Sequence, residues 1–174
     1  AFSGLWSESV VRGPAWHFGD LARRVERALV VLESLAAAEP VVSRSESDRS
    51  VATFLEILLA GHDSLVAYRR RHRSDVEWSA VLATLVADAR NPRSLAFSAD
   101  RIRRDADAIE WDSGVAALEA IRSGWSEPSG PVSYGDSAGV LRDFAMQLTR
   151  ERLATPPDPA VVTGLRVERS HVDD

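Results

Sequence analysis

The chain has 174 residues, of which 45% are hydrophobic, and a formal net charge of −5, which is typical of one globular domain that buries its own core. It contains no cysteine, and all 21 of its basic residues are arginine. This composition excludes disulfides, a cysteine nucleophile, a Schiff-base lysine and a P-loop lysine. The negative charge weighs against nucleic-acid binding, no apolar run is long enough to cross a membrane, and the lack of cysteine suits the cytoplasm.

Apolar residues at helical spacing predict the first two helices. One covers residues 15–38 and has an apolar stripe that includes Leu21, Val25 and Leu32. Glu39-Pro40 is expected to end it, because proline disrupts a helix interior. A polar, serine-rich stretch follows, and the next predicted helix covers residues 48–73.

Capping patterns predict where two further helices begin. Ser74 stands three residues before Glu77, which is a capping box. Asn91-Pro92 predicts another start, with asparagine as N-cap and proline in the first turn. Weaker patterns predict a short helix over 115–121, a loop over 124–136, a last helix over 138–153 and an irregular tail over 156–174. We therefore expect an all-α bundle of about five to six helices over residues 1–155, as part of a larger helical domain.

The first predicted helix carries a charged cluster beside its apolar stripe. Arg24 and Glu26 fall at the two edges of the stripe, and Arg23 and Arg27 fall together on the back. An arginine beside a buried stripe must pair with a carboxylate or bind an anion, because an unpaired buried charge is costly. The cluster is therefore either an anion site or an interhelical salt-bridge network.

The second predicted helix places His62 and Arg69 on its apolar face. They are seven residues apart, so they share that face if the helix is continuous. His62 could act as a general base or donate to an anion, and the alternative is a core histidine with its hydrogen bonds satisfied. The basic run 69–73 could contact phosphates, or it could be a solvated helix end.

Signatures of metal and cofactor sites are weak. Cysteine ligands are absent, and the chain has neither an HExxH motif nor a glycine-rich phosphate loop. We expect no metal ion and no cofactor.

Three stretches resemble the alpha-E domain, a predicted helical family named for its Glu-Arg motif. They are FSGLWSESVVRGPAWHFGDLARRVERA (2–28), HDSLVAYRRRH (62–72) and ADARNPRSLAF (87–97). The chain is similar to the C-terminal portion of the family, because an earlier segment with its own Glu-Arg pair is missing. The resemblance points to these residues: Glu8, Arg12, Asp20, Arg24, Glu26, Arg27, Arg69, Asn91, Arg93 and Ser94.

Alpha-E domains occur beside circularly permuted ATP-grasp and transglutaminase-like proteins. The resemblance therefore implies an accessory helical module of amide or peptide ligation, which docks on an ATP-grasp partner and binds an acidic peptide or nucleotide. One alternative is a transferase or hydrolase, which requires Glu26 and His62 to converge in one cleft. Another is a structural bundle that forms homo-oligomers.

Overall fold

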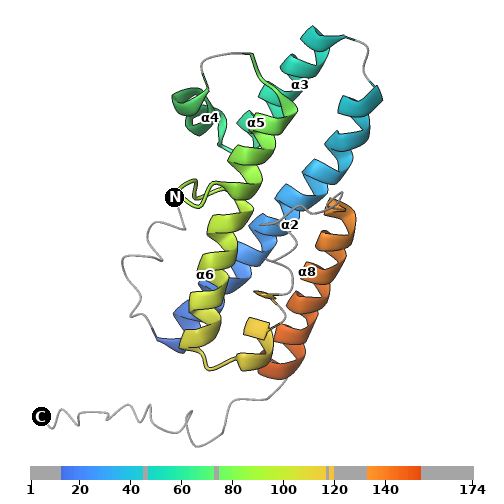
Figure 1. Cartoon of the computed structure of the whole chain (residues 1–174). Helices are drawn as coiled ribbons and strands as arrows, with labels where there is room; N and C mark the ends of the chain where they lie inside the picture. The colour runs from blue at the N-terminus through green and yellow to red at the C-terminus, as the bar shows by residue number, and fades with distance from the viewer. Residues whose placement is uncertain (1–12, 45–46, 73–74, 117, 120–132, 154–174) are drawn as a thin grey trace, which may run out of the picture.

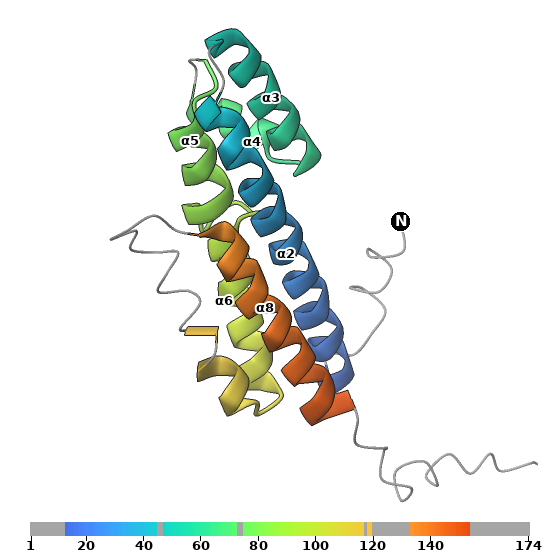
Figure 2. The ribbon, with the colours of Figure 1, turned by 90° about the vertical axis from the view of Figure 1, so that its right-hand side faces the viewer.

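The computed structural model describes residues 13–44, 47–72, 75–116, 118–119 and 133–153. These residues form α-helices and two short π-helical segments, and no strand, so the predicted all-α bundle is confirmed. Three helices make the body: α2 (Pro14–Arg44), α6 (Leu95–Ala108) and α8 (Tyr134–Leu148). Figures 1 and 2 show α6 and α8 packed along α2, both running in the opposite direction to it.

Helix α2 forms as predicted but is longer at its C-terminal end. Pro14 occupies its first turn, where a missing backbone N–H costs nothing. Its stripe is buried between α6 and α8, with Leu21, Leu32 and Leu35 fully inaccessible. The prediction that Glu39-Pro40 ends the helix is wrong, because α2 continues through Pro40 to Arg44. Proline removes one hydrogen bond there, and the packing of the preceding turns is sufficient to keep the last turn helical.

The single helix predicted over residues 48–73 is two helices. Helix α3 (Asp48–Gly61) is capped by Ser47, and α4 (Leu65–Arg71) leaves it at an angle of 119°. The chain turns at Asp63, which has a φ of 50°, a conformation that aspartate tolerates better than most residues. No single helix in the described ranges is long and apolar enough to cross a membrane, whereas α3 and α4 together would pass on length and composition alone.

The next helix starts also differ from the prediction. Helix α5 (Trp78–Leu82) continues into the π-helical segment η1 (Ala83–Ala87). Its N-cap is Glu77, which makes no side-chain capping bond, and Ser74 lies outside the described residues. Helix α6 begins at Leu95 rather than at Pro92, because Ser94 caps it by accepting from the N–H of Phe97 at 3.1 Å.

The C-terminal part of the bundle is partly as predicted. Residues 112–116 and 118–119 are helical, in agreement with a short helix near residues 115–121. Helix α8 begins at Tyr134, inside the predicted loop, because Ser133 caps it, and it continues into the π-helical segment η2 (Thr149–Leu153). The predicted tail, residues 156–174, and most of the predicted loop lie outside the described residues.

Candidate functional site

A pocket of about 380 Å³ lies where the middle of α2 faces the turn between α3 and α4 and the segment before α6. The pocket is lined by Arg23, Glu26, Arg27, Val30, Gly61, His62, Asp63 and Arg93. Glu26 and His62, which come from segments far apart in the chain, therefore share one pocket, as the enzyme alternative requires.

Helical spacing explains the α2 wall of this pocket. Arg23, Arg27 and Val30 are separated by four and three residues, so they lie on one face of α2 with Glu26 beside them. The sequence predicted that Arg23 and Arg27 lie on the back of the helix, away from the apolar stripe. In the structure, the turn that holds His62 faces this side of α2, and together they line an open pocket.

The three arginines of the pocket differ in how their charge is balanced. Arg23 donates to a carboxylate oxygen of Asp20 at 3.1 Å, and Arg93 lies 2.9 Å from Asp63. Arg27 makes no hydrogen bond and no ion pair with any residue that the structure describes. Its side chain is nevertheless half-buried, so Arg27 is a partly desolvated cation with an unused guanidinium.

The pKa of Arg27 reflects this environment. Burial lowers the pKa of Arg27 most, the neighbouring Arg93 and Arg24 lower it further, and Asp20 and Asp63 partly offset them. A guanidinium stays protonated at neutral pH in proteins, so the lowered pKa means that the charged form is held at a cost. An anion bound at Arg27 would remove that cost.

His62 completes the wall of the pocket opposite α2. It caps the C-terminal end of α3, and burial lowers its pKa from the ordinary 6.5, with Asp63 opposing the shift. Near pH 7 the ring is therefore neutral, with one nitrogen that can donate and one that can accept. His62 is half-buried at the end of α3, and it does not lie on the apolar face of a continuous helix as the sequence predicted.

A second polar cluster is buried between α2 and α6. Asp20 and Asp105 are only 6% and 4% exposed, and the Nδ1 atom of His17 lies 2.8 Å from Asp105. Arg24 lies 3.7 Å from Asp20 and stacks over the ring of Phe97. Burial raises the pKa of Asp105, and the nearby Asp20 adds to the rise, while the hydrogen bond from His17 opposes it. Arg24 and Asp20 therefore form an ion pair within α2, whereas the salt-bridge interpretation of the charged cluster required pairs between helices.

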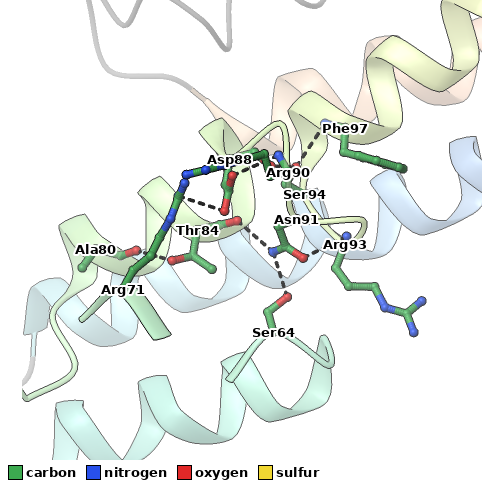
Figure 3. Close-up of polar contacts among 10 residues, drawn as sticks. All are labelled: Ser64, Arg71, Ala80, Thr84, Asp88, Arg90, Asn91, Arg93, Ser94 and Phe97. Atoms are coloured by element: carbon green, nitrogen blue, oxygen red, sulfur yellow. Dashed lines mark hydrogen bonds and ion pairs between the residues drawn. The ribbon is translucent and has the colours of Figure 1, made fainter. Parts of the chain in front are cut away.

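Asn91 joins three segments of the chain and is not the N-cap of α6. Its amide nitrogen donates to Ser64 at 3.1 Å and to the carbonyl of Thr84 at 3.0 Å, and its oxygen accepts from the N–H of Arg93 at 3.1 Å (Figure 3). Asn91 thus connects the α3–α4 turn to η1 and holds the segment that carries Arg93. Sequence reasoning could not find the contact with Ser64, because Ser64 lies 27 residues away in the chain.

Among the other predicted residues, Arg69 lies away from the pocket. Arg69 is half-exposed and forms an ion pair with Glu56, so its predicted position on an apolar face is wrong, because the chain turns before α4. Glu8 and Arg12 lie outside the described residues. The basic run also contributes Arg71, which forms an ion pair with Asp88 at 2.8 Å (Figure 3).

One motif was missed in the sequence. Residues 135–139 read Gly-Asp-Ser-Ala-Gly, which matches the GxSxG pattern of a hydrolase nucleophile elbow. In the structure this pentapeptide lies inside the first turns of α8, whereas the elbow needs a sharp turn between a strand and a helix. The motif therefore carries no argument for hydrolysis. In the described part of the chain, no three His, Asp or Glu side chains are grouped so that they could hold a metal ion.

Comparisons with known proteins point to one family. A family model described as Alpha-E, a predicted alpha-helical domain with a conserved ER motif, matches residues 1–150. Uncharacterised proteins of Mycobacterium bovis and of two strains of Mycobacterium tuberculosis are each 32% identical over 173 residues. The match covers 88% of this chain and 19% of each relative, so the chain spans about a fifth of their length. No solved structure matches the chain.

Proposed function

Because the chain belongs to the Alpha-E family, we propose that it is an accessory helical module of an ATP-grasp-associated ligation system and binds a carboxylate or phosphate group in the pocket at Arg27. Within the matched residues 1–150, the Glu-Arg dipeptide occurs once, at Glu26-Arg27. Both residues of this dipeptide line the pocket. The Glu-Arg pair that describes the family therefore includes the one arginine lining this pocket that has no partner among the described residues.

The single observation that carries the proposal is the unpaired state of Arg27. The other two arginines of the pocket have carboxylate partners, whereas Arg27 is half-buried beside like charges. Such an arrangement lowers stability unless an anion completes it, and guanidinium groups bind carboxylates and phosphates with paired hydrogen bonds. The pocket volume of about 380 Å³ suits a small molecule or the end of a chain.

The ATP-grasp partner follows from the family resemblance and from the anion site. ATP-grasp enzymes join carboxylates to amines, so a carboxylate-binding module beside one would hold a substrate or product. The exposed apolar side chains of Ile57 on α3 and Val66 on α4 offer contact area for a partner, each being about two-thirds exposed. A pull-down with an ATP-grasp protein from the same genome tests the association, and failure of the two proteins to bind would count against it.

The anion site is tested by titrating the chain with inorganic phosphate and with propionate. The Arg27→Gln variant is expected to lose at least about tenfold in affinity for both, because a hydrogen bond to a charged group is removed. Arg69→Gln is the matched control, since Arg69 is an exposed helix arginine outside the pocket. Binding that is equally strong in the wild type and in Arg27→Gln would refute the site.

A transferase or hydrolase is the second candidate, and it is favoured by the shared pocket of Glu26 and His62. With its lowered pKa, a neutral His62 could accept a proton near pH 7. The candidate requires turnover by the chain alone. Mass spectrometry of small peptides and esters incubated with the chain would remove this candidate if the substrates remain unchanged and the anion still binds.

A further inference from the structure

Among the charged residues that line the pocket, one cation and one anion have no partner within the protein's described residues. Arg23 is paired with Asp20 outside the pocket, and Arg93 is paired with Asp63 at its rim. The two remaining charged residues are Glu26 and Arg27, and neither makes an ion pair with any residue that the structure describes. The pocket therefore offers a ligand one positive and one negative partner.

Glu26 and Arg27 do not neutralise each other, although they are neighbours in sequence. Adjacent residues of an α-helix point about 100° apart around its axis, so their side chains address different points of the pocket. Both still line it, because the turn at His62 faces this part of α2. One ligand can then contact both groups only if it carries opposite charges on nearby atoms.

A ligand with a single charge satisfies only half of this site. A phosphate or a simple carboxylate would pair with Arg27 but would bring negative charge towards Glu26 and Asp63. An isolated amine would pair with Glu26 but would approach Arg27 and Arg93. A free α-amino acid carries its carboxylate and its ammonium group on one carbon, so it can pair with both residues.

The rest of the pocket has room for a small side chain. Val30 contributes an apolar surface to the lining and is half-exposed. A Cβ atom built at Gly61 would meet nothing within 4 Å, so the opposite wall is open at that point. The neutral ring of His62 adds a hydrogen-bonding partner without a further charge.

We propose that the pocket is a binding site for a free α-amino acid, with the carboxylate at Arg27 and the ammonium group at Glu26. This inference rests on the proposed anion site and names its ligand class. An amino acid has the amine that a carboxylate–amine ligase consumes, so the module would hold the amine-bearing substrate of that reaction.

The test compares ligands that differ by one charged group. L-alanine carries both groups, propionate lacks the ammonium group, and L-alaninamide lacks the carboxylate. Each is titrated into the wild-type chain and into Glu26→Gln and Arg27→Gln, with binding followed by NMR. Glu56→Gln and Arg69→Gln are the matched controls, because these residues form a surface ion pair outside the pocket. Circular dichroism verifies that every variant remains helical.

The wild type is expected to bind L-alanine at least about tenfold more tightly than propionate, and Glu26→Gln should remove that preference while it keeps propionate binding. Arg27→Gln should lose both ligands, and the controls should behave as the wild type does. Equal binding of L-alanine and propionate by the wild type, lost in Arg27→Gln, would overturn the amino-acid site and leave the anion site standing. No binding of propionate, phosphate or L-alanine by the wild type would overturn both.

Discussion

Arg27 and Arg69 are both helix arginines of this bundle, but they differ in burial and in the pairing of their charge. Arg69 is half-exposed and has Glu56 as a partner, an arrangement that contributes little to stability because water screens it. Arg27 is half-buried, unpaired among the described residues and close to two further arginines. Residue type alone could not tell which of the two arginines is available to bind an anion, whereas the charged partners around each one do.

In the segment that holds Arg93, we expect substitution of Asn91 to lower the free energy of unfolding most. We expect Asn91→Ala to lower the free energy of unfolding by roughly 2–4 kcal/mol, because it leaves the buried carbonyl of Thr84 and the N–H of Arg93 without their partner. Urea unfolding followed by circular dichroism measures the change. The neighbouring Arg90→Ala, an exposed turn residue, should change stability by less than about 0.5 kcal/mol. Equal effects of both substitutions would contradict the buried role of Asn91.

The raised pKa of Asp105 predicts how the stability of the folded chain changes with pH. Its pKa in the folded chain is raised above the ordinary 3.8, mainly by burial, so the folded state binds its proton more tightly than the unfolded state does. Stability from this group is therefore lost as the pH rises from about 3.8 through the raised pKa. Asp105→Asn, which keeps an oxygen for His17, should gain stability relative to the wild type as the pH rises from about 3.8 through the raised pKa of Asp105. A difference in unfolding free energy that is constant over this range would refute the effect.

At the scale of elements, periodicity predicted where helices lie better than where they begin and end. The stripes of α2, α6 and α8 are the buried stripes of the structure, because burial on one face sets helical spacing. The ends depend on single residues whose effect is decided by packing. Pro40 is tolerated inside α2, and Ser94 caps α6 in preference to Asn91, because Asn91 is engaged in buried hydrogen bonds.

Pro40, inside α2, allows a prediction about the stability of that helix. Pro40→Ala should stabilise the chain by roughly 1–3 kcal/mol, because it restores a backbone hydrogen bond and removes a clash within the helix. Thermal unfolding measures the gain. Pro14→Ala is the matched control and should be neutral or slightly destabilising, since proline suits the first turn of a helix. Unchanged or lower stability in Pro40→Ala would contradict this expectation.

At the scale of the whole molecule, the candidate site is formed by segments that the sequence could only partly bring together. Glu26, Arg27 and His62 were identified as candidates from their helix faces and from the family resemblance, and they share the pocket. Arg69 was assigned to the same face as His62 because a continuous helix was assumed. The turn at Asp63 ends that helix, so Arg69 lies at the surface and His62 lines the pocket together with α2.

The turn also explains why the pocket itself could not be predicted. The face of α2 that carries Arg23 and Arg27 has the polar composition of a solvated helix back. The α3–α4 turn lines the pocket from the other side, and Asn91 donates to Ser64 in the same turn. Long-range contacts of this kind leave no local signal, although the Glu-Arg dipeptide at residues 26–27 marked the position.

The most direct measurement of the central claim is the NMR signal of the Arg27 Nε–H group during a titration with inorganic phosphate. The account predicts that this signal shifts progressively and saturates, because the guanidinium gains the partner that it lacks in the structure. The signal of Arg69, which already has Glu56, should move little over the same range. An Arg27 signal that does not respond, or that responds no more than that of Arg69, would contradict an anion site in this pocket.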